Sequence, residues 1–345
     1  MNLFAFLSKE KNKKVFACPA VFSQVYIYPD GRVFLCPDCY MSSKALIGNL
    51  NEYPFEKIWN SKKAIEVRKE VKKGIYNYCK PSYCFAKSNY NCRLIPFKNI
   101  DYSPKQKKFP KMVCIGSDCE CNVNCIMCRP TLSRLTDEEL VEMNKKIDSI
   151  FIPILKDAEE LTLSTTADPF ASRHTSLLMK TAVEKYPNLK LNLLTNGILC
   201  SKTKCDELGV TSRLSKIMVS FHASNEETYN NVVKNGNFKK VIQNIEWLSE
   251  LKGNNKIDAL FFAFVVSSKN YQDIPNFVEF TKKYNAKALF WCCRDWGGNL
   301  KNSDEPLEIL QYSHPKHQEF VNILKQVDMN SDKCYFSPEL KFIAK

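Results

Sequence analysis

Three cysteines in the run CNVNCIMC are the residues of this chain best suited to chemistry. Cys121, Cys125 and Cys128 follow the spacing C-x₃-C-x₂-C. Three thiolates this close in sequence can ligate three irons of one [4Fe–4S] cluster, whereas a cluster usually takes four cysteines. The fourth iron would then have no protein ligand and would be open for chemistry. The alternatives are a zinc site or unrelated buried thiols, but zinc normally takes four ligands in pairs and the triplet lacks a fourth.

The elements that must position the triplet alternate in type from residue 112 onward. Helical patterns separate six apolar runs, and one helix opens with Thr136 and Glu139 at capping-box spacing. Alternating strands and helices favour a parallel sheet with right-handed crossovers. We therefore predict an α/β fold, an open and partial (β/α)6 TIM-like barrel, with its chemistry at the carboxyl ends of the strands. The predicted strands are MVCI (112–115), ELTLS (160–164), LKLNLL (189–194), KIMVSF (216–221), IDALFFAFVV (257–266) and AKALFW (286–291).

The triplet, which directly follows the first of these strands, resembles the signature of the radical S-adenosylmethionine (SAM) enzymes. The resemblance implies that the open iron chelates the amino and carboxylate groups of SAM. It also implies that an electron from the cluster splits the C–S bond and makes a 5′-deoxyadenosyl radical. The residue before the third cysteine is often aromatic in this family and packs near the adenine. Here it is Met127, a flexible apolar substitute.

The resemblance continues at the next two strand ends, where it implies further contacts with SAM. Family members often carry a Gly-Gly-Glu type motif for the SAM amino group after the second strand. This chain has TTADPFAS (165–172), which makes Thr166 and Asp168 the candidates, although Asp168 could instead cap a helix. The third strand ends in TNG (195–197), as is usual in the family. Asn196 is a candidate there, and we expect the glycine to serve a tight backbone position.

Two later strand ends and a segment between them complete the predicted cofactor site. VSFHAS (219–224) resembles a region that lies under SAM, so Ser220 and His222 are candidates, and a structural hydrogen bond is the alternative role for His222. Lys234 stands where the family has an arginine for the SAM carboxylate, and a lysine lacks the bidentate fork. Val266, at the end of the fifth strand, would flank the adenine.

Candidates for contact with the substrate follow the sixth strand, in FWCCRDWGG (290–298). Arg294, Asp295 and Trp296 would point into the mouth of the barrel, and the alternative is a rim loop with a surface Arg–Asp pair. Other cysteines could be buried fillers, or one of them could return a hydrogen atom to a substrate radical. They are Cys292, Cys293 and Cys334.

A second group of cysteines precedes the triplet and resembles the SPASM auxiliary-cluster module. The resemblance rests, in order, on Cys18, Gly31-x₄-Cys36, IGNL (47–50), IWNS (58–61) and Cys79-x₄-Cys84. Because SPASM modules usually follow the radical SAM core, the arrangement here is permuted. The resemblance implies one closed auxiliary [4Fe–4S] cluster, with Cys39 and Cys92 as spare or substitute ligands and a structural zinc knot as the alternative. The predicted ligands are Cys18, Cys36, Cys79 and Cys84.

Two local patterns stand out in the cysteine-rich part. Residues 23–36 are predicted to form two strands around a Pro-Asp-Gly turn, and residues 55–74 one helix that stops near Gly74.

The whole chain divides into five predicted segments: an N-terminal lead (1–15), a small Cys-rich α+β auxiliary-cluster domain (16–97), a polar linker (98–111), the radical SAM core (112–300), and a C-terminal helix and tail (301–345).

Composition agrees with a globular chain. Of the 345 residues, 44% are hydrophobic and 12% aromatic, so a packed core is expected. No apolar run approaches the roughly 20 residues that span a bilayer. The apolar N-terminal stretch precedes its lysines, the reverse of a signal peptide, and would pack on the protein or touch a membrane surface. Without an export signal, the 16 cysteines are expected to be metal ligands in a reducing cytoplasm.

The net charge of +13 lies entirely in the first third of the chain. Residues 1–111 carry 21 Lys and Arg against 8 Asp and Glu, which leaves 29 of each kind in the remainder. A basic module could attract an acidic peptide, a phosphate-bearing molecule or RNA. The alternative is a lysine-rich solvated surface, and no RNA-binding motif is present.

We therefore expect a radical SAM enzyme that abstracts a hydrogen atom from a peptide or protein substrate, with a flavodoxin- or ferredoxin-type electron donor. The same chemistry on a sugar or other small surface-precursor metabolite is the first alternative, because the chain is short and shows no additional leader-peptide-binding domain. Nucleic acid is an unlikely substrate. An iron–sulfur or zinc scaffold with an inactive core is the non-enzymatic alternative.

Overall fold

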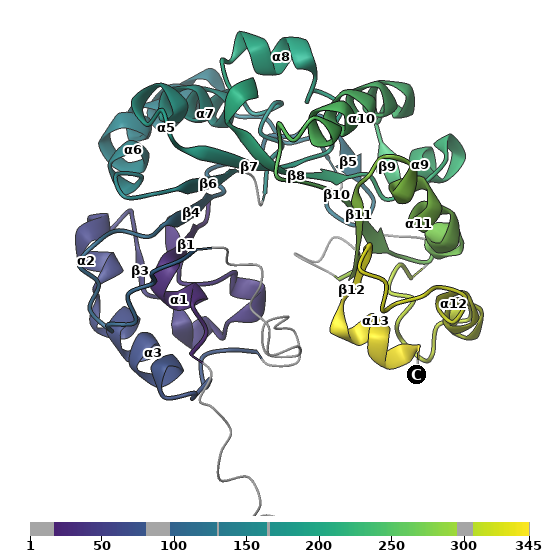
Figure 1. Ribbon diagram of the computed structural model, residues 1–345, viewed down its shortest axis with the longest axis horizontal. Coiled ribbons are helices and arrows are strands. Elements are labelled where there is room, and N and C mark those ends of the chain that lie inside the picture. Colours follow the sequence, from purple (N-terminus) through teal and green to yellow (C-terminus); the bar gives the residue numbers. More distant parts are fainter. Residues whose placement is uncertain (1–16, 81–96, 130, 164–165, 295–305, 345) are drawn as a thin grey trace, which may run out of the picture.

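The computed structural model describes residues 17–80, 97–129, 131–163, 166–294 and 306–344. Its six predicted strands form one continuous parallel run in chain order. They are β4 (Met112–Ile115), β6 (Glu160–Leu163), β7 (Lys190–Thr195), β8 (Leu214–Ser220), β10 (Ala259–Val266) and β11 (Lys287–Cys292). In Figure 1 this run curves into an open ring with helices along its outside, which confirms the predicted partial barrel.

The sheet extends beyond this run at both ends, so that its ten strands include the cysteine-rich part. At one end β12 (Cys334–Phe336) pairs parallel with β11. At the other end β1 (Gln24–Ile27) pairs parallel with β4, and antiparallel β2 (Arg32–Phe34) and β3 (Gly48–Asn49) follow. The predicted pair of strands around the turn at residues 29–31 is therefore present. The sheet also joins the N-terminal part to the core through backbone hydrogen bonds.

The predicted helices of the core are present and begin at capping residues. Thr136 and Glu139 form the expected capping box, and Asn225 and Asn237 cap the helices that follow them. A π-helical turn (Ile147–Phe151) continues the first of these helices. The helices of the core and the C-terminal part are α5 (Asp137–Lys146), α6 (Ile152–Ile154), α7 (Arg173–Lys185), α8 (Lys202–Glu207), α9 (Glu226–Val232), α10 (Phe238–Gly253), α11 (Ile274–Lys283), α12 (His317–Leu324) and α13 (Pro338–Ile343).

The single helix predicted over residues 55–74 is wrong, because the structure has two helices there. These are α2 (Phe55–Trp59) and α3 (Lys62–Lys72), and a third short helix, α1 (Ala20–Ser23), precedes β1. Ser61 causes the break, since its backbone is extended and its hydroxyl accepts from the Ala64 N–H as the N-cap of α3. The predicted stop is present at Gly74, whose φ of +76° suits a glycine.

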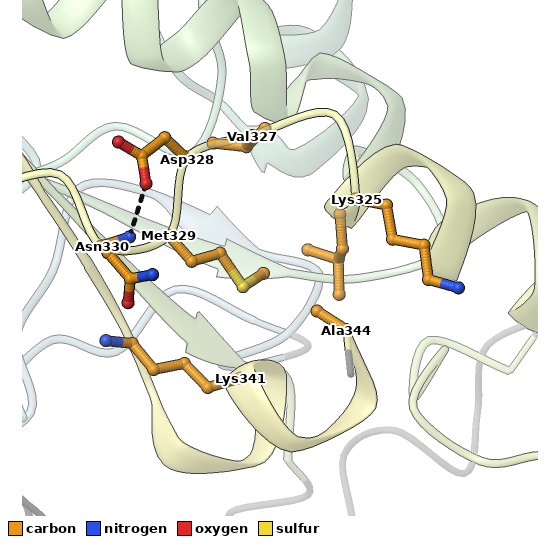
Figure 2. Close-up of a pocket in the computed structure, with 8 residues that line it drawn as sticks. Lys325, Val327, Asp328, Met329, Asn330, Lys341 and Ala344 are labelled. Carbon is orange, nitrogen blue, oxygen red and sulfur yellow. Dashed lines mark hydrogen bonds between the residues drawn. The ribbon is translucent and has the colours of Figure 1, made fainter.

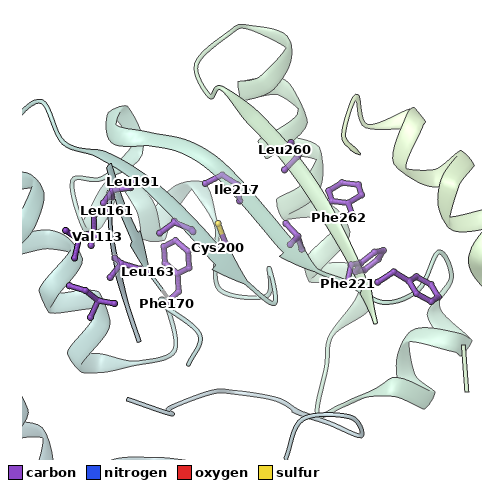
Figure 3. Packing of buried hydrophobic residues seen from close by; sticks show 14 of the residues in the cluster. Val113, Leu161, Leu163, Phe170, Leu191, Cys200, Ile217, Phe221, Leu260 and Phe262 are labelled. Carbon is purple, nitrogen blue, oxygen red and sulfur yellow. The ribbon is translucent and has the colours of Figure 1, made fainter. Parts of the chain in front are cut away.

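Apolar side chains from successive strands make one core under the helices. Parallel strands covered by helices read as near-continuous apolar runs, and the runs found in the sequence are buried. Figure 3 shows Val113, Leu161, Leu191 and Ile217 from four neighbouring strands, with Phe221 and Phe262 farther along the sheet. This rigid sheet holds the strand-end loops that carry the predicted site. Within the described residues, no helix has both the length and the apolar character needed to cross a bilayer.

A buried arginine joins the predicted linker to the N-terminal part. Arg68 in α3 is fully buried and donates to the carbonyls of Val21 and Trp59 at 2.9 Å and of Pro104 at 3.2 Å. Its guanidinium also lies 4.0 Å from the centre of the Trp59 ring. Burial lowers the pKa of Arg68 to about 9. Residues 98–111 are thus held against α2 and α3 by hydrogen bonds.

Replacing Arg68 by alanine is expected to destabilise the protein by about 3–5 kcal/mol. The substitution removes three hydrogen bonds from a charged donor and leaves a cavity beside Trp59. Urea unfolding followed by tryptophan fluorescence measures the loss. Lys69→Ala removes the same charge from an exposed position in the same helix, so it should change stability by less than about 1 kcal/mol. Equal stability of the two variants would contradict the proposed role of Arg68.

Candidate functional site

The predicted cluster loop lies between β4 and α5 and is fixed by backbone pairing. Its centre forms a short strand, β5 (Asn124–Cys125), antiparallel to β9 (Val233–Lys234) in the connection after α9. The Cys128 N–H donates to the Cys125 carbonyl at 2.9 Å, which closes a tight turn between these two cysteines. The positions of the thiols are therefore set by residues far apart in the sequence.

The three thiols of the triplet lie within electrostatic reach of one another. Burial raises the pKa of Cys125 to about 12, and the neighbouring Cys128 and Cys121 thiols contribute to this increase. Burial also raises the pKa of Cys121, with added contributions from Asp168 and Cys128. As thiolates these groups would repel one another, and bound iron would offset that repulsion.

A [4Fe–4S] cluster fits this arrangement of sulfur atoms. No three His, Cys, Asp or Glu side chains in the part of the chain that the structure describes are placed to hold one metal ion. A [4Fe–4S] cluster makes a different demand, because each thiolate binds its own iron. Cys121, Cys125 and Cys128 provide three mutually near but separate thiols, which meets that demand.

Two buried carboxylates attach the cluster loop to the start of α7. Asp118 Oδ2 accepts from the hydroxyls of Ser172 and Thr175, both at 2.8 Å. Glu120 Oε2 accepts from the Arg173 N–H at 3.0 Å. Negative charge is favourable at a helix N-terminus, so these bonds stabilise both the helix and the loop. The sequence analysis missed both acids, although they alternate with cysteines in the run SDCEC (117–121).

Arg129, directly after the triplet, is a second residue that the sequence analysis missed. Its guanidinium donates to the Thr166 carbonyl at 2.6 Å and to the carbonyl of Cys119. Burial alone would lower the pKa of Arg129, but the nearby thiols of Cys128, Cys121 and Cys119 outweigh burial and raise it. A permanent positive charge therefore lies beside the sulfur atoms. Its position next to the third cysteine was the available signal.

Asp168 is buried and uses all its acceptor sites within the protein. Its Oδ2 accepts from the Thr195 hydroxyl and the Asn196 N–H, each at 2.8 Å. Its Oδ1 accepts from the N–H groups of Phe170 at 3.0 Å and Ala171 at 3.2 Å. A carboxylate has about four lone-pair sites, and four donors occupy them. Asp168 thus ties the loop after β6 to the loop after β7, whereas the N-cap of α7 is Ser172.

Asp168→Asn is expected to destabilise the protein by about 2–3 kcal/mol. An amide presents an NH₂ group where the carboxylate accepted two bonds, so the Thr195 hydroxyl and the Asn196 N–H lose their acceptor. Thermal unfolding with and without SAM would measure the effect. Asp258→Asn is the matched control, because Asp258 pairs with Lys190 at a half-exposed position where ion pairs contribute little. Equal melting temperatures for the two variants would contradict this role.

Asn196 lies directly against the cluster loop. Its Nδ2 is 3.7 Å from Cys121 Sγ and 2.9 Å from Asn122 Oδ1, and its Oδ1 accepts from the Ile198 N–H at 3.0 Å. Gly197 has a φ of +82°, and a Cβ there would come within 2.9 Å of a valine side chain. The tight backbone position expected for this glycine is therefore present.

His222 and Lys234 each have an internal hydrogen-bond partner. His222 Nδ1 accepts from the Val265 N–H at 3.1 Å, which leaves the proton of the neutral ring on Nε2. Burial lowers the pKa of His222 to about 4. Lys234 is exposed and its Nζ donates to the Asn230 carbonyl at 3.1 Å, while its backbone pairs with Asn124 of the cluster loop. Lys234 therefore lies beside the triplet in the fold.

The remaining predicted cofactor residues lie at the carboxyl edge of the sheet or in the loops above it. Thr166 donates its hydroxyl to the Asp118 carbonyl at 2.6 Å, beside the cluster loop. Met127 is 5% exposed and packs with the core. Ser220 and Val266 are the last residues of β8 and β10.

The structure separates two of the residues predicted to act on the substrate. Arg294 follows the carboxyl end of β11 and forms an ion pair with Glu339 of α13. Cys334 instead pairs with Ala288 near the amino end of β11. A hydrogen-atom donor must reach the mouth of the barrel, so the position of Cys334 contradicts that role. Asp295 and Trp296 lie outside the described residues.

The predicted auxiliary-cluster cysteines come from separated turns of the N-terminal part. Cys79 forms an isolated bridge with Met41, beside the turn that carries Cys39. Burial raises the pKa of Cys39 to about 11 and Asp38 adds to this, whereas Arg294 and Lys80 lower it. Arg294, from the far end of the sheet, thus lies within electrostatic reach of the cysteine-rich part. Cys18 and Cys36 are half-buried, and Cys84 and Cys92 lie outside the described residues.

One cavity in the structure has no part in this constellation. It is about 330 Å³ in volume and lies among α12, α13 and the segment between α12 and β12. Figure 2 shows Asp328, Met329 and Lys341 around it, and none of its lining residues is a predicted site residue.

Two family models match the chain, one over each of its two cysteine-bearing parts. Residues 18–85 match the SPASM iron–sulfur cluster-binding domain, and residues 119–281 match the radical SAM superfamily. The chain thus contains a radical SAM domain preceded by a SPASM domain. The predicted permuted order is therefore confirmed. The predicted cofactors are confirmed as well: the radical SAM core takes a [4Fe–4S] cluster and SAM, and the SPASM domain takes an auxiliary iron–sulfur cluster.

Solved structures similar to this chain are distant in sequence. Streptococcus suis SuiB bound to S-adenosylmethionine is 12% identical, with a TM-score of 0.43 over 66% of this chain and 50% of SuiB. SuiB bound to the precursor peptide SuiA is 11% identical, with a TM-score of 0.47 over 82% and 64%. Native anSMEcpe with bound AdoMet is 17% identical, with a TM-score of 0.40 over 62% and 58%. The chain thus spans half to two thirds of the length of these proteins. A comparison with curated proteins finds no match.

Proposed function

We propose that this protein is a radical SAM enzyme that cleaves SAM reductively and removes a hydrogen atom from a peptide or protein substrate, with the auxiliary cluster assisting electron transfer. The observation that carries the proposal is the triplet itself. Its three near but separate thiols lie in a loop held beside the strand-end loops by Asp118, Glu120 and the β5–β9 pair. When bound, the cluster and SAM supply one-electron cleavage and hydrogen-atom abstraction.

The residues of this chain position the reactants rather than supply the electrons. Arg129 places a fixed positive charge beside the sulfur atoms and bridges Cys119 to Thr166. Asp168 holds the loops after β6 and β7 in a fixed relation. Both contacts order the edge of the sheet at which SAM would lie, and such ordering lowers the entropic cost of reaching the reactive geometry.

The substrate class rests on the SPASM resemblance and on charge. Many radical SAM proteins with SPASM-type modules modify ribosomally made peptides. The positive charge of the first third would favour an acidic peptide, and also an acidic electron donor of the flavodoxin or ferredoxin type. Arg294 follows β11 near one end of the sheet and lies within electrostatic reach of Cys39 near the other end, so it would meet a substrate that enters there.

Deuterium transfer to 5′-deoxyadenosine would test both parts of this proposal. The protein is reconstituted with iron and sulfide without oxygen and mixed with SAM, a reductant and a perdeuterated peptide fraction from host cells. We expect release of 5′-deoxyadenosine that carries deuterium. A parallel reaction uses a perdeuterated sugar-nucleotide fraction. Deuterium transfer from that fraction alone would indicate that the substrate is a sugar. SAM left intact under all conditions would overturn the enzymatic proposal.

A further inference from the structure

We infer that Asn196 tunes the reduction potential of the SAM-binding cluster by donating an N–H to the sulfur of Cys121. The inference rests on the proposed function only in requiring that the triplet holds the cluster. The contact joins the loop after β7 to the cluster loop, two segments 75 residues apart in sequence, with Nδ2 3.7 Å from Sγ. The TNG sequence alone gave no reason to connect Asn196 with a cluster sulfur.

The orientation of the Asn196 amide is determined by its other contacts. Its Oδ1 accepts from the Ile198 N–H at 3.0 Å, so the NH₂ group must face the cluster loop. One N–H of that group then has Asn122 Oδ1 at 2.9 Å as its acceptor. The acceptor of the other N–H is Cys121 Sγ. If the amide oxygen and nitrogen of Asn196 were exchanged, the oxygen would face Asn122 Oδ1 and the Cys121 thiolate. Neither of these groups can donate a hydrogen bond, so that orientation is unfavourable.

The rest of the chain holds this amide in place. The Asn196 N–H donates to Asp168 Oδ2 at 2.8 Å, and the side chain of Asn196 has all its donors and its acceptor engaged. Asn196 is 7% exposed, so little water competes for the sulfur. A donor that is fixed and buried contributes more to the energy of a nearby charge than one that moves in solvent.

The physical effect follows from the change in cluster charge. Reduction adds one negative charge, part of which resides on the ligand sulfurs. A hydrogen bond to sulfur stabilises the reduced form more than the oxidised form and raises the reduction potential. Asn196 would thus make the cluster easier to reduce and would act as a tuning residue. Because its polar groups are engaged in this way, the predicted direct contact of Asn196 with SAM is not needed to explain its position.

The test is a redox titration of the reconstituted holoprotein followed by electron paramagnetic resonance. The variant is Asn196→Ala, and we expect about a tenfold smaller equilibrium constant for reduction, which is about 59 mV for one electron. Asn192→Ala is the matched control. Asn192 is an equally buried asparagine in β7 whose amide donates to Glu160 rather than to a cysteine, so the potential of that variant should equal the parent's.

A second measurement tests the hydrogen bond in the parent protein itself, so the result does not depend on how much cluster the Asn196→Ala variant binds. Asparagine labelled with ¹⁵N in the side-chain amide should give a nitrogen coupling to the reduced cluster in pulsed resonance spectra of the parent. The coupling should be lost in Asn196→Ala. Equal potentials in parent and variant, or no such coupling in the parent, would overturn the inference. A shifted potential together with intact SAM would retain the inference and reject the proposed function, so the two failures are distinguishable.

Discussion

Cys125→Ala is expected to abolish the reductive cleavage of SAM, which is the largest effect expected of any single substitution here. Cys125 is half-buried, its thiol lies within electrostatic reach of the thiols of Cys121 and Cys128, and its backbone is fixed by the β5–β9 pair. No other cysteine in the described residues occupies its place in the spacing. Two thiolates would remain, and they leave the cluster with two irons that lack protein ligands. Release of 5′-deoxyadenosine should fall below detection.

The control for Cys125→Ala is Cys119→Ala in the same loop. Cys119 is exposed, and its hydrogen bond to Arg129 uses the backbone carbonyl, which alanine retains. We expect Cys119→Ala to keep its iron and to cleave SAM at close to the parent rate. Cys125→Ala should lose about half of the iron if the protein holds two clusters. Parent-level cleavage by Cys125→Ala would remove the basis of the proposed function.

The strands of the core could be predicted because their signal is local. Each parallel strand is buried on both faces and so appears as a short apolar run. β4 begins and ends where the run MVCI does, and the five other strands differ from their runs by a few residues at most. The break between α2 and α3 was missed because it depends on Ser61. That residue bonds to Ile47 as well as to Ala64, and the contact with Ile47 cannot be read from a helical pattern.

The contacts of the site were less predictable because they join distant segments. Asp168 was expected to bind SAM or to cap a helix, and both its oxygens are used to hold neighbouring loops. Asp118 and Glu120 were missed because an acid in a cysteine-rich loop has no characteristic spacing. Cys334 was considered as a hydrogen-atom donor because the sequence does not show its register in the sheet. That register pairs Cys334 with Ala288, near the amino end of β11.

Cys36→Ala is expected to separate SAM cleavage from substrate turnover. Cys36 follows β2 in the SPASM domain. Burial raises the pKa of the half-buried Tyr26, and the Cys114 and Cys36 thiols contribute to this increase, so the Cys36 thiol lies near Tyr26. The core retains its own triplet, so cleavage of SAM without substrate should remain within a few-fold of the parent. The auxiliary cluster should be lost, and with it the electron transfer assigned to that cluster.

The matched control for Cys36→Ala is Cys39→Ala. Cys39 lies three residues away and was predicted to be a spare or substitute ligand, not one of the four main ligands. We expect Cys39→Ala to retain full iron and to yield the same modified peptides as the parent by mass spectrometry, whereas Cys36→Ala yields none. If the two variants lose iron equally, Cys39 is a ligand as well. If Cys36→Ala retains all its iron, Cys36 is not a ligand.

Arg294 lies within electrostatic reach of Cys39 and offsets part of the pKa increase caused by burial and Asp38. A substrate entering between the two ends of the sheet would therefore lie close to both the auxiliary cluster and Arg294.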